Sequence, residues 1–387
     1  MKNINYIIWL SMVFGNSTET VWKILKSYNS ADKAYYEIVS GICPIKFTYN
    51  QNKNIKNISL DNANDIIIYC DKNKIKITCY LLSDYPKQFI NLRYPPVVLY
   101  YRGDISCVNG KNITCVGTRQ PSRYTTEIIS AICTQLVENN FVIVSGFARG
   151  ADITSHLVAV KMNRPTICVL GCGIDIDYPS GHATYKEKII ESGGVLITEY
   201  SPLERFGRGN FHKRNILLAS LSRATIVFEA KKTSGSLITA NEAYNMGKKV
   251  LCIPPADIFD ERYTGNINIL RNFAIPLYGM EDVFKVYEDV FKVYNENNKI
   301  NNTYIKNIPK AVSEIIQPEK PLNKAVPEHS FTPVQQKILD LLNNCTLHMD
   351  VIINKIDIDV AQLCLEIMEL QQMGVIEEVA GNRFRKC

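Results

Sequence analysis

Hydrophobic residues near the start of the chain recur at the spacing of an α-helix. The first apolar stripe contains Ile7, Leu10 and Val13, which are three residues apart. The second contains Val21, Ile24 and Leu25. This period predicts helices within residues 4–40. Gly15 and Asn16 break the pattern between the stripes, and Ser17 is placed to cap the second helix.

Residues 50–76 are rich in Asn, Lys and Ile, which blurs this period, and we interpret residues 65–69 as a short strand. Pro86, Pro95 and Pro96 then favour extended backbone that leads into an apolar run over residues 97–101. We expect residues 1–80 to form a small helical module of the SAM or helix-hairpin-helix type.

From residue 112 to about 255, short apolar runs alternate with helical stretches. The runs that we interpret as strands cover residues 113–116, 141–145, 166–170, 195–198, 225–229 and 249–253. This alternation is typical of an α/β fold, a parallel sheet with helices on both faces. It predicts a doubly wound domain, which we place at residues 81–294.

Residues 295–332 carry many Asn, Lys and Pro residues and no sustained apolar period, so we interpret them as a flexible linker. Just before it, residues 281–287 are repeated without change as residues 288–294. The repeat places apolar residues at heptad spacing, which fits an extended helix or a short coiled coil. It equally fits a recent duplication without function.

Residues 333–387 have the pattern of a separate domain. Apolar periods at residues 334–342, 351–356 and 360–373 are followed by Gly374 and an alternating run over residues 375–379. Three helices and a β-ribbon describe a C-terminal winged helix. Winged helices bind DNA or other proteins, so the shape alone does not assign a partner.

The composition is that of an ordinary globular protein, with 46% hydrophobic and 21% charged residues. The twelve cysteines mostly lie in apolar runs and form no C-x-x-C pair, which speaks against a zinc site. They favour reduced thiols and a cytoplasmic location, with disulfides as the alternative. The apolar run at residues 6–14 is too short to span a membrane and lacks the flanks of a signal peptide, so no membrane association is expected.

Four of the turns that follow predicted strands are rich in glycine or hydroxyl residues. They are residues 117–119, 145–152, 171–175 and 231–236. Ligands of an open parallel sheet bind beyond the carboxyl ends of its strands, so these turns are the candidate site. Because glycine lets backbone N–H groups approach phosphate oxygens and helix N-termini favour negative charge, we expect a phosphate-bearing ligand.

The common nucleotide-binding motifs are absent from these turns. Gly171 and Gly173 are followed by Ile176 where G-x-G-x-x-G needs its third glycine, and no G-x-x-x-x-G-K-[ST] occurs. This disfavours a dinucleotide or ATP, and we expect no cofactor.

Positive charge is concentrated between residues 205 and 249, where nine basic and two acidic residues give a net charge of +7, against +6 for the whole chain. The cations in or beside the strand-end turns, and the aromatic residues near them, are Arg119, Arg149, Lys213, Arg214, Lys231, Lys232, Phe147, Phe206 and Phe211. Proteins hold single-stranded nucleic acid with cations interleaved with aromatic rings. The pattern favours a polyanionic ligand.

Catalytic arrangements find little support in the sequence. We expect the His and Asp residues of these turns to pack, to cap helices or loops, or to meet solvent or phosphate: His156, His182, His212, Asp152 and Asp175. A role for Glu229 or Glu242 as a general acid or base near a nucleotide sugar stays open.

Several segments between residues 84 and 278 match the signatures of a known family in number and order. They are YPPVVLYYRG at 94–103, VGTR at 116–119, SGFARGAD at 145–152, GCGIDIDYP at 171–179, GGVLITE at 193–199, Phe211 with Arg214 and Asn215, and SGSLIT at 234–239. Through them the chain resembles the DNA-processing protein A (DprA/Smf) family. The expected helical module and winged helix are similar to flanking domains that many members carry.

The resemblance implies an extended Rossmann-like domain that binds single-stranded DNA and forms a homodimer. It implies a role in placing a RecA-type recombinase on incoming strands during natural transformation, without catalysis. It also implies a strand-binding pocket around Arg119, Ser145, Gly146, Arg214, Asn215 and the turn that begins at Lys231. Our candidate DNA-binding residues are Gly117, Thr118, Arg119, Ser145, Gly146, Phe147, Arg149, Gly150, Gly171, Gly173, Lys213, Arg214, Asn215, Lys231, Lys232, Ser234, Gly235 and Ser236.

The sequence departs from the family pattern in two regions. Ile216 stands where an arginine is usual, and Lys213 is a candidate substitute for it. Pro255 and Phe273 stand where glycine is common, nearer the expected dimer side.

Two other functions stay open. Residues 234–242 are also similar to the phosphate-holding loop of nucleoside-monophosphate phosphoribohydrolases, in which a Glu assists glycosidic cleavage, although the double glycine of that family is absent. The third interpretation is a defence or regulatory protein that reuses a strand-binding scaffold.

Overall fold

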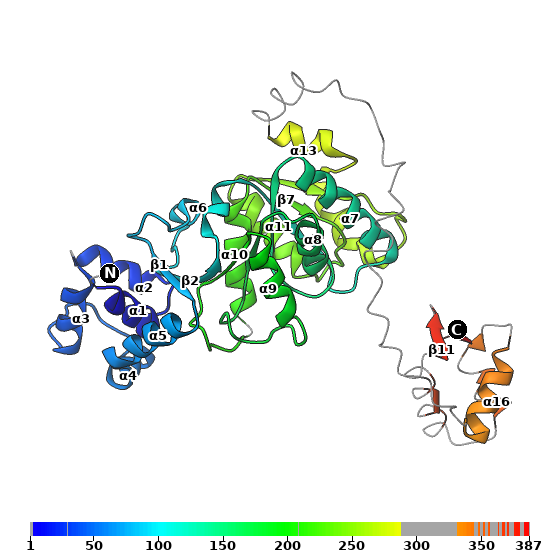
Figure 1. The fold of residues 1–387 in the computed structure, drawn as a ribbon, viewed down its shortest axis with the longest axis horizontal. Coiled ribbons are helices and arrows are strands. Elements are labelled where there is room, and N and C mark those ends of the chain that lie inside the picture. The colour runs from blue at the N-terminus through cyan, green and yellow to red at the C-terminus, as the bar shows by residue number, and fades with distance from the viewer. Residues whose placement is uncertain are drawn as a thin grey trace. The chain divides into compact units, whose positions relative to one another are not determined.

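The computed structural model describes residues 3–28, 30–207, 209–287 and 331–343, and beyond them only short pieces, among them 347–348, 375–379 and 383–386 (Figure 1). The chain divides into two compact units, Met1–Ile316 and Gln317–Cys387. The described strands form a nine-stranded sheet in the first unit and a three-stranded sheet in the second.

Helices open the first unit. They are α1 (Ile4–Phe14), α2 (Glu19–Ser27), α3 (Ala31–Val39), α4 (Tyr49–Asn57) and α5 (Leu60–Lys72). α1 is central, because it contacts the other four helices and buries most of its side chains. The fully buried Trp9 also donates its indole N–H to the Ile58 carbonyl oxygen at 2.7 Å. The helices expected within residues 4–40 are therefore present.

Two expectations for this segment are wrong. Residues 65–69 lie within α5 and not in a strand, because Ala63 and Cys70, two helical turns apart, are both buried in the core that α5 shares with α1. Thr18, and not Ser17, caps α2, since the Thr18 hydroxyl accepts a hydrogen bond from the Val21 N–H at 3.3 Å. Ser17 instead donates to a carboxylate oxygen of Glu199 at 2.6 Å.

The large sheet is mostly parallel. Its strands are β1 (Lys76–Cys79), β2 (Val98–Gly103), β3 (Lys111–Val116), β4 (Phe141–Ser145), β5 (Thr166–Val169), β6 (Val195–Thr198), β7 (Ala224–Val227), β8 (Lys249–Cys252) and β9 (Ile275–Pro276). They lie in the order β1-β2-β6-β5-β4-β3-β7-β8-β9, and only β1 with β2 and β2 with β6 pair antiparallel. The six strands predicted between residues 112 and 255 are all present, with ends that differ by no more than two residues.

Helices cover both faces of this sheet. They are α6 (Lys87–Ile90), α7 (Arg123–Glu138), α8 (Ala151–Lys161), α9 (Ala183–Glu191), α10 (Asn210–Leu221), α11 (Ser236–Asn245), α12 (Thr264–Asn272) and α13 (Met280–Val286), with short 3-10 helices η1 (Ile105–Asn109) and η2 (Glu261–Tyr263). Side chains of α7, α8 and α13 share one buried core with the central strands. Those of α10, α11 and α12 share a second core with the alternate strand residues, on the opposite face. The α/β class predicted from the sequence is confirmed.

The order of the parallel strands reverses between β3 and β7. From β3 the chain proceeds to β4, β5 and β6 on one side, and then to β7 and β8 on the other. Such a reversal opens a crevice beyond the carboxyl ends of the two strands, which is where ligands of open α/β sheets bind. The turns at residues 117–122 and 228–235 lead out of these two strands and border the crevice.

Hydrogen bonds fasten the amino-terminal helices to the sheet. The Asn16 amide, between α1 and α2, donates to the carbonyl oxygens of Val98 and Glu199, both at 2.7 Å, and accepts from the Val98 N–H at 3.0 Å. Tyr69 of α5 donates its hydroxyl to Asp175 at 2.9 Å. Asp175 is thus a structural carboxylate that joins α5 to the turn after β5.

The first copy of the duplicated heptad is helical. It lies mostly in α13, where Val283 and Phe284 are buried, and the Tyr287 hydroxyl donates to the Asn112 carbonyl oxygen at 2.6 Å. The second copy at residues 288–294 and the expected linker as far as residue 330 lie outside the described residues. A coiled coil through both copies therefore stays a prediction.

The second unit contains α16 (Pro333–Leu341), β10 (Leu347–His348), β11 (Ile376–Val379) and β12 (Arg383–Lys386), with strand order β10-β12-β11. Thr332 caps α16 in a reciprocal capping box with Gln335. Most residues of the two further expected helices lie outside the described part of the chain, so the winged helix stays a prediction. No helix among the described residues is long and apolar enough to cross a membrane.

Candidate functional site

A pocket of about 430 Å³ lies at the carboxyl ends of β3 and β7, where the strand order reverses. The turns after both strands and the first turns of α10 and α11 form its walls. Half of the predicted site residues line it: Gly117, Thr118, Arg119, Arg214, Asn215, Lys231, Ser234, Gly235 and Ser236. Segments far apart in the sequence are thus brought together at one edge of the sheet.

The other predicted residues do not line this pocket. Arg149, Lys213 and Lys232 are exposed, and Gly150 is half-buried. The buried ones are Ser145, Gly146, Phe147, Gly171 and Gly173. The exposed and half-buried residues remain available to a long ligand. The buried residues support the pocket from beneath.

Arg119 and Lys231 supply the accessible positive charge of the pocket. Both side chains are exposed, and neither is ion-paired with any residue that the structure describes. The guanidinium of Arg119 lies over the ring of Phe211, with Cζ 5.7 Å from the ring centroid. Neither cation forms an ion pair with a described carboxylate, and Asp260, whose charge interacts with that of Lys231, is already paired with Arg262. The charge of Arg119 and Lys231 is therefore available to a polyanion.

Arg214 has a different environment from the one predicted. Its side chain is 5% exposed, and its Nη1 donates to the carbonyl oxygens of Gly146 and of Val169, the latter at 2.9 Å. Its Nε donates to the Asn215 side chain at 3.1 Å. Burial lowers the pKa of Arg214, and the nearby Asp152 carboxylate opposes that shift. Arg214 therefore braces the turn after β4 against β5 and forms part of the pocket wall.

The glycines of the turn after β4 serve close packing of the backbone. A Cβ at position 146 would collide with the Arg214 guanidinium. Gly150 has a φ of 77°, and a Cβ there would collide with the backbone of Thr118 and Arg119. The Ala151 N–H also donates to the Thr118 carbonyl oxygen at 3.0 Å. Gly150 therefore lets the turns after β3 and β4 pack closely, and Gly146 leaves room for the Arg214 guanidinium.

Asp152 begins α8 as the sequence suggested, but it lies inside the protein. Its side chain is buried, and it accepts a hydrogen bond from the Ala148 N–H at 3.3 Å. Burial raises the pKa of Asp152, and the positive charge of Arg214 opposes that shift. The carboxylate therefore stabilises the turn and its buried arginine.

The glycine turn after β5 lies beneath residues 201–204. The Gly173 N–H donates to the Glu204 carbonyl oxygen at 2.8 Å, and the Asp175 N–H donates to that of Pro202 at 3.2 Å. A Cβ at Gly171 would come within 3.1 Å of the Phe211 ring. These two N–H groups are thus already bonded within the chain, and the turn supports Phe211 from below.

Aromatic side chains form a cluster next to Arg119. The ring centroids of Tyr178 and Phe206 are 4.3 Å apart, and those of Tyr178 and Phe211 are 5.5 Å apart. Phe206 is 50% exposed. The prediction that Phe147 is available for stacking is wrong, because Phe147 is 1% exposed and packs against His156 and His182. Tyr178 takes its place, and its proximity to two aromatic residues more than 25 positions away is not visible in the sequence.

The buried titratable side chains near the pocket are structural. His156 is fully buried and bonded to the Thr166 hydroxyl at 2.7 Å, and burial lowers the pKa of His156 to about 3. Glu229 is buried and accepts from the hydroxyls of Ser122 and Thr125 at 2.8 and 2.6 Å. Glu242 does not line the pocket. Neither carboxylate is therefore placed to act on a ligand there.

The described residues contain neither a metal-binding cluster nor a disulfide. Within them, no group of three or more His, Cys, Asp or Glu side chains is arranged to hold a metal ion. The nine cysteines that the structure describes are free thiols, most of them buried.

Some pocket residues lie outside the predicted set. The polar ones are Asp152, His212, Thr233 and Thr239. Thr239 follows Ser236 by three residues on α11, so both occupy the same helical face, and this spacing is a signal that the sequence does contain. Thr233 extends the row of hydroxyls in the turn after β7.

Comparisons with known proteins show which family the chain belongs to. The family described as DNA recombination-mediator protein A matches residues 76–288, more than half of the chain. Protein Smf of Synechocystis is 28% identical over 322 residues, which cover 78% of each protein. DNA processing protein DprA of Bacillus subtilis is 31% identical over 204 residues, which cover 52% of this chain and 68% of that protein.

One relative matches the chain in both sequence and fold. DNA processing protein DprA of Streptococcus pneumoniae is 28% identical over 291 residues, 74% of this chain and 100% of that protein. The X-ray structure of that protein superposes with a TM-score of 0.63 and covers 74% of this chain and 98% of the other. The matched sequence and the shared fold together establish that the chain belongs to the DNA recombination-mediator protein A family, that of the DprA and Smf proteins.

Proposed function

We propose that this chain binds single-stranded DNA at the carboxyl edge of its large sheet and acts by binding, without chemical turnover. The observation that carries the proposal is the position of Arg119 and Lys231. These exposed cations border the pocket on the turns after β3 and β7, without carboxylate partners among the described residues. Lys213, Lys232 and Arg149 are exposed nearby and extend the basic surface.

The aromatic cluster favours single strands over duplex. Phe206 is exposed, and Phe211 lies beside the Arg119 guanidinium, so a base has a ring to stack on next to a cation for its phosphate. In a duplex the faces of the bases are already stacked and cannot reach such rings. The arrangement therefore suits an unpaired strand.

Family membership supports a role in DNA processing and recombination. On this basis we extend the proposal to a cytoplasmic homodimer that protects incoming strands and passes them to a RecA-type recombinase during natural transformation. Residues 81–294 would hold the strand, and residues 333–387 would form a winged helix on a linker at residues 295–332. The boundary between the two compact units, Ile316 to Gln317, falls within that linker and supports the division.

The test is a fluorescence-anisotropy titration of labelled single-stranded and duplex oligonucleotides over a range of salt concentrations. We expect tighter binding of single strands and a slope of log affinity against log salt of about −0.7 per phosphate contacted. The double variant Arg119→Ala, Lys231→Ala should bind more weakly and with a shallower slope. The matched control is Lys23→Ala, Lys53→Ala, which removes two exposed lysines from α2 and α4.

Equal binding by the two double variants would contradict the proposed interface. Tighter binding of duplex than of single strands would indicate that the second unit, and not the carboxyl edge of the large sheet, recognises DNA. Release of free base from nucleoside monophosphates at an enzymatic rate would contradict the absence of turnover and favour the phosphoribohydrolase alternative.

A further inference from the structure

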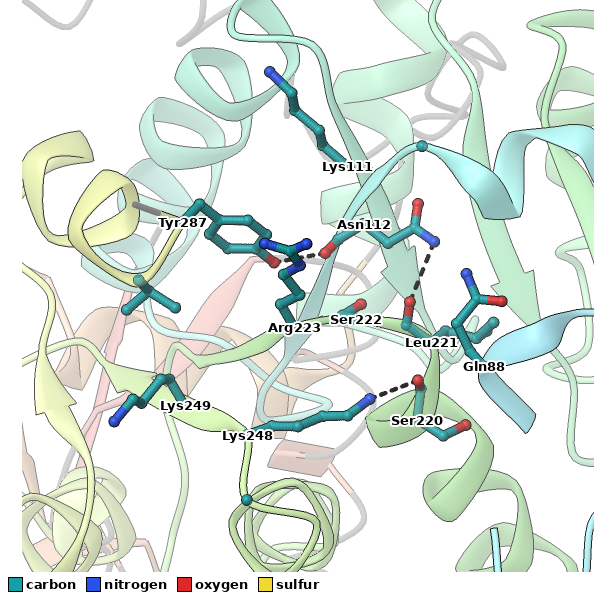
Figure 2. Close-up of a pocket in the computed structure, with 13 residues that line it drawn as sticks. Gln88, Lys111, Asn112, Ser220, Leu221, Ser222, Arg223, Lys248, Lys249 and Tyr287 are labelled. Atoms are coloured by element: carbon teal, nitrogen blue, oxygen red, sulfur yellow. Dashed lines mark hydrogen bonds between the residues drawn. The ribbon is translucent and has the colours of Figure 1, made fainter. Parts of the chain in front are cut away.

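A second pocket lies at the opposite, amino-terminal edge of the large sheet (Figure 2). It has a volume of about 580 Å³ and is formed by the first residues of β3 and β8, the residues that join α10 to β7, and the end of α13. Among the described residues, its lining contains four cations, Lys111, Arg223, Lys248 and Lys249, and no carboxylate. None of the candidate DNA-binding residues belongs to it.

One of these cations has an internal role. Lys248 donates from Nζ to the carbonyl oxygens of Ala219 and Ser220, at 2.9 and 2.6 Å. These carbonyls belong to the last turn of α10, where a cation offsets the negative end of the helix dipole. Burial lowers the pKa of Lys248 to about 8. The end of α10 is therefore already compensated by Lys248, and Lys111 and Lys249 are not required for it.

Lys111 and Lys249 are placed to meet a ligand. Each is the first residue of its strand, each is exposed, and neither is ion-paired with a residue in the described ranges. Figure 2 shows the side chains of Lys111, Arg223 and Lys249 around the pocket, with that of Lys248 directed toward Ser220. The exposed rim of the pocket thus carries positive charge on two sides, from Lys111 and from Lys249.

The floor of the pocket is held in place by hydrogen bonds. Tyr287 donates to the Asn112 carbonyl oxygen at 2.6 Å, and the Asn112 side chain donates to the carbonyl oxygens of Val108 and Leu221 at 2.6 and 3.2 Å. These bonds join β3, η1, the end of α10 and the end of α13. A site that is already formed loses little conformational entropy when a ligand enters.

We propose that this amino-edge pocket binds phosphate groups, either of a free nucleotide or of a DNA backbone. The described lining has no carboxylate, which disfavours a cationic ligand, and the pocket volume lies within the roughly 300–1,000 Å³ usual for small-ligand sites. A phosphate monoester carries about −1.5 to −2 charges near pH 7, which matches several rim cations better than a single carboxylate does. The inference goes beyond the proposed function and does not depend on it.

The test compares two full-length variants with the same change in net charge. The amino-edge variant is Lys111→Glu, Lys249→Glu, and the control is Lys23→Glu, Lys53→Glu. Calorimetric titration with pyrophosphate and with thymidine monophosphate probes the free-nucleotide source. Anisotropy with single-stranded oligonucleotides of about 6 and about 30 nucleotides, on either side of the usual site sizes of about 4–16, probes the DNA source.

For a free nucleotide, we expect the amino-edge variant to lose at least about tenfold in affinity for the two small probes. For DNA, we expect weaker binding of the longer oligonucleotide alone, with a salt slope that is shallower by about 0.7 for each phosphate that the variant no longer binds. Either result supports the site, provided that the control variant binds like the unmodified chain. An amino-edge variant that matches the control with every probe overturns it.

Two further variants keep the result interpretable. Lys111→Gln, Lys249→Gln removes the charges without reversing them, and it replaces the Glu variant if circular dichroism shows that the latter does not fold. Arg119→Ala, Lys231→Ala disrupts the carboxyl-edge pocket and should bind pyrophosphate normally. The two pairs of variants thus test the carboxyl-edge pocket and the amino-edge pocket independently, so one proposal can fail while the other holds.

Discussion

The Phe211 ring lies within 6 Å of two guanidinium groups, one exposed and one buried. The Cζ atom of Arg119 is 5.7 Å from the ring centroid of Phe211, and that of the buried Arg214 is 5.8 Å from it. Arg119 is exposed and unpaired among the described residues, whereas Arg214 is fixed by backbone carbonyl groups. One cation can therefore turn toward a phosphate while the other holds the wall behind the ring.

Replacing Phe211 with Leu should weaken single-strand binding without changing its salt dependence. Stacking of one base on an aromatic ring contributes about 1–3 kcal/mol, so we expect affinity to fall by roughly five- to a hundredfold. Arg119→Ala, by contrast, should reduce the salt slope by about 0.7, since it removes one phosphate contact. Anisotropy titrations at several salt concentrations distinguish the two effects. An altered slope for Phe211→Leu would argue against a stacking role.

Replacing Arg214 with Ala should destabilise the fold. The change leaves the buried Gly146 and Val169 carbonyl groups and the Asp152 carboxylate without their partner, at a cost of about 2–3 kcal/mol. Urea unfolding should show a lower midpoint. The neighbouring exposed Lys213→Ala is the control, and it should change stability by less than about 0.5 kcal/mol while weakening strand binding. If Arg214→Ala kept full stability and lost only DNA affinity, Arg214 would be a direct contact after all.

Buried His156 should make the folded chain less stable at low pH. Burial lowers the pKa of His156 from 6.5 to about 3. As the pH falls below about 6.5, His156 therefore binds a proton in the unfolded chain but stays neutral in the folded chain. The free energy of unfolding should therefore decrease as the pH is lowered. His156 alone contributes up to about 1.4 kcal/mol for each pH unit. His156→Asn lacks the effect, so its stability difference from the unmodified chain should narrow between pH 6.5 and 4. Urea titrations that give a constant difference would contradict this.

Asn16 should matter more for stability than its place in a loop suggests. Asn16→Ala removes two hydrogen bonds to β2 and one to the end of β6, and leaves the buried Val98 N–H without that acceptor. We expect a loss of about 2 kcal/mol in the free energy of unfolding. The exposed Asn57→Ala serves as the control and should stay within about 0.5 kcal/mol. Similar midpoints for both variants in thermal unfolding would show that the loop does not hold the helices to the sheet.

The sequence alone determined six of the nine strands of the large sheet and the edge that carries the pocket. Buried parallel strands are continuous apolar runs, and the turns after them are fixed by connectivity, so Arg119, Lys231 and Ser234 could be assigned to one edge. Helical period likewise located α1 and α2.

Only the tertiary structure decided which of these side chains face outward. Residues 65–69 have the local pattern of a strand but pack as a helix against α1, and Arg214 and Phe147 lie in charged or aromatic segments yet point inward. Lys111 and Lys249 open different strands and line the same pocket only because β3, β7 and β8 are neighbours in the sheet. Local pattern reports the period of burial along one element, whereas the direction of a side chain from a turn depends on packing against segments distant in the chain.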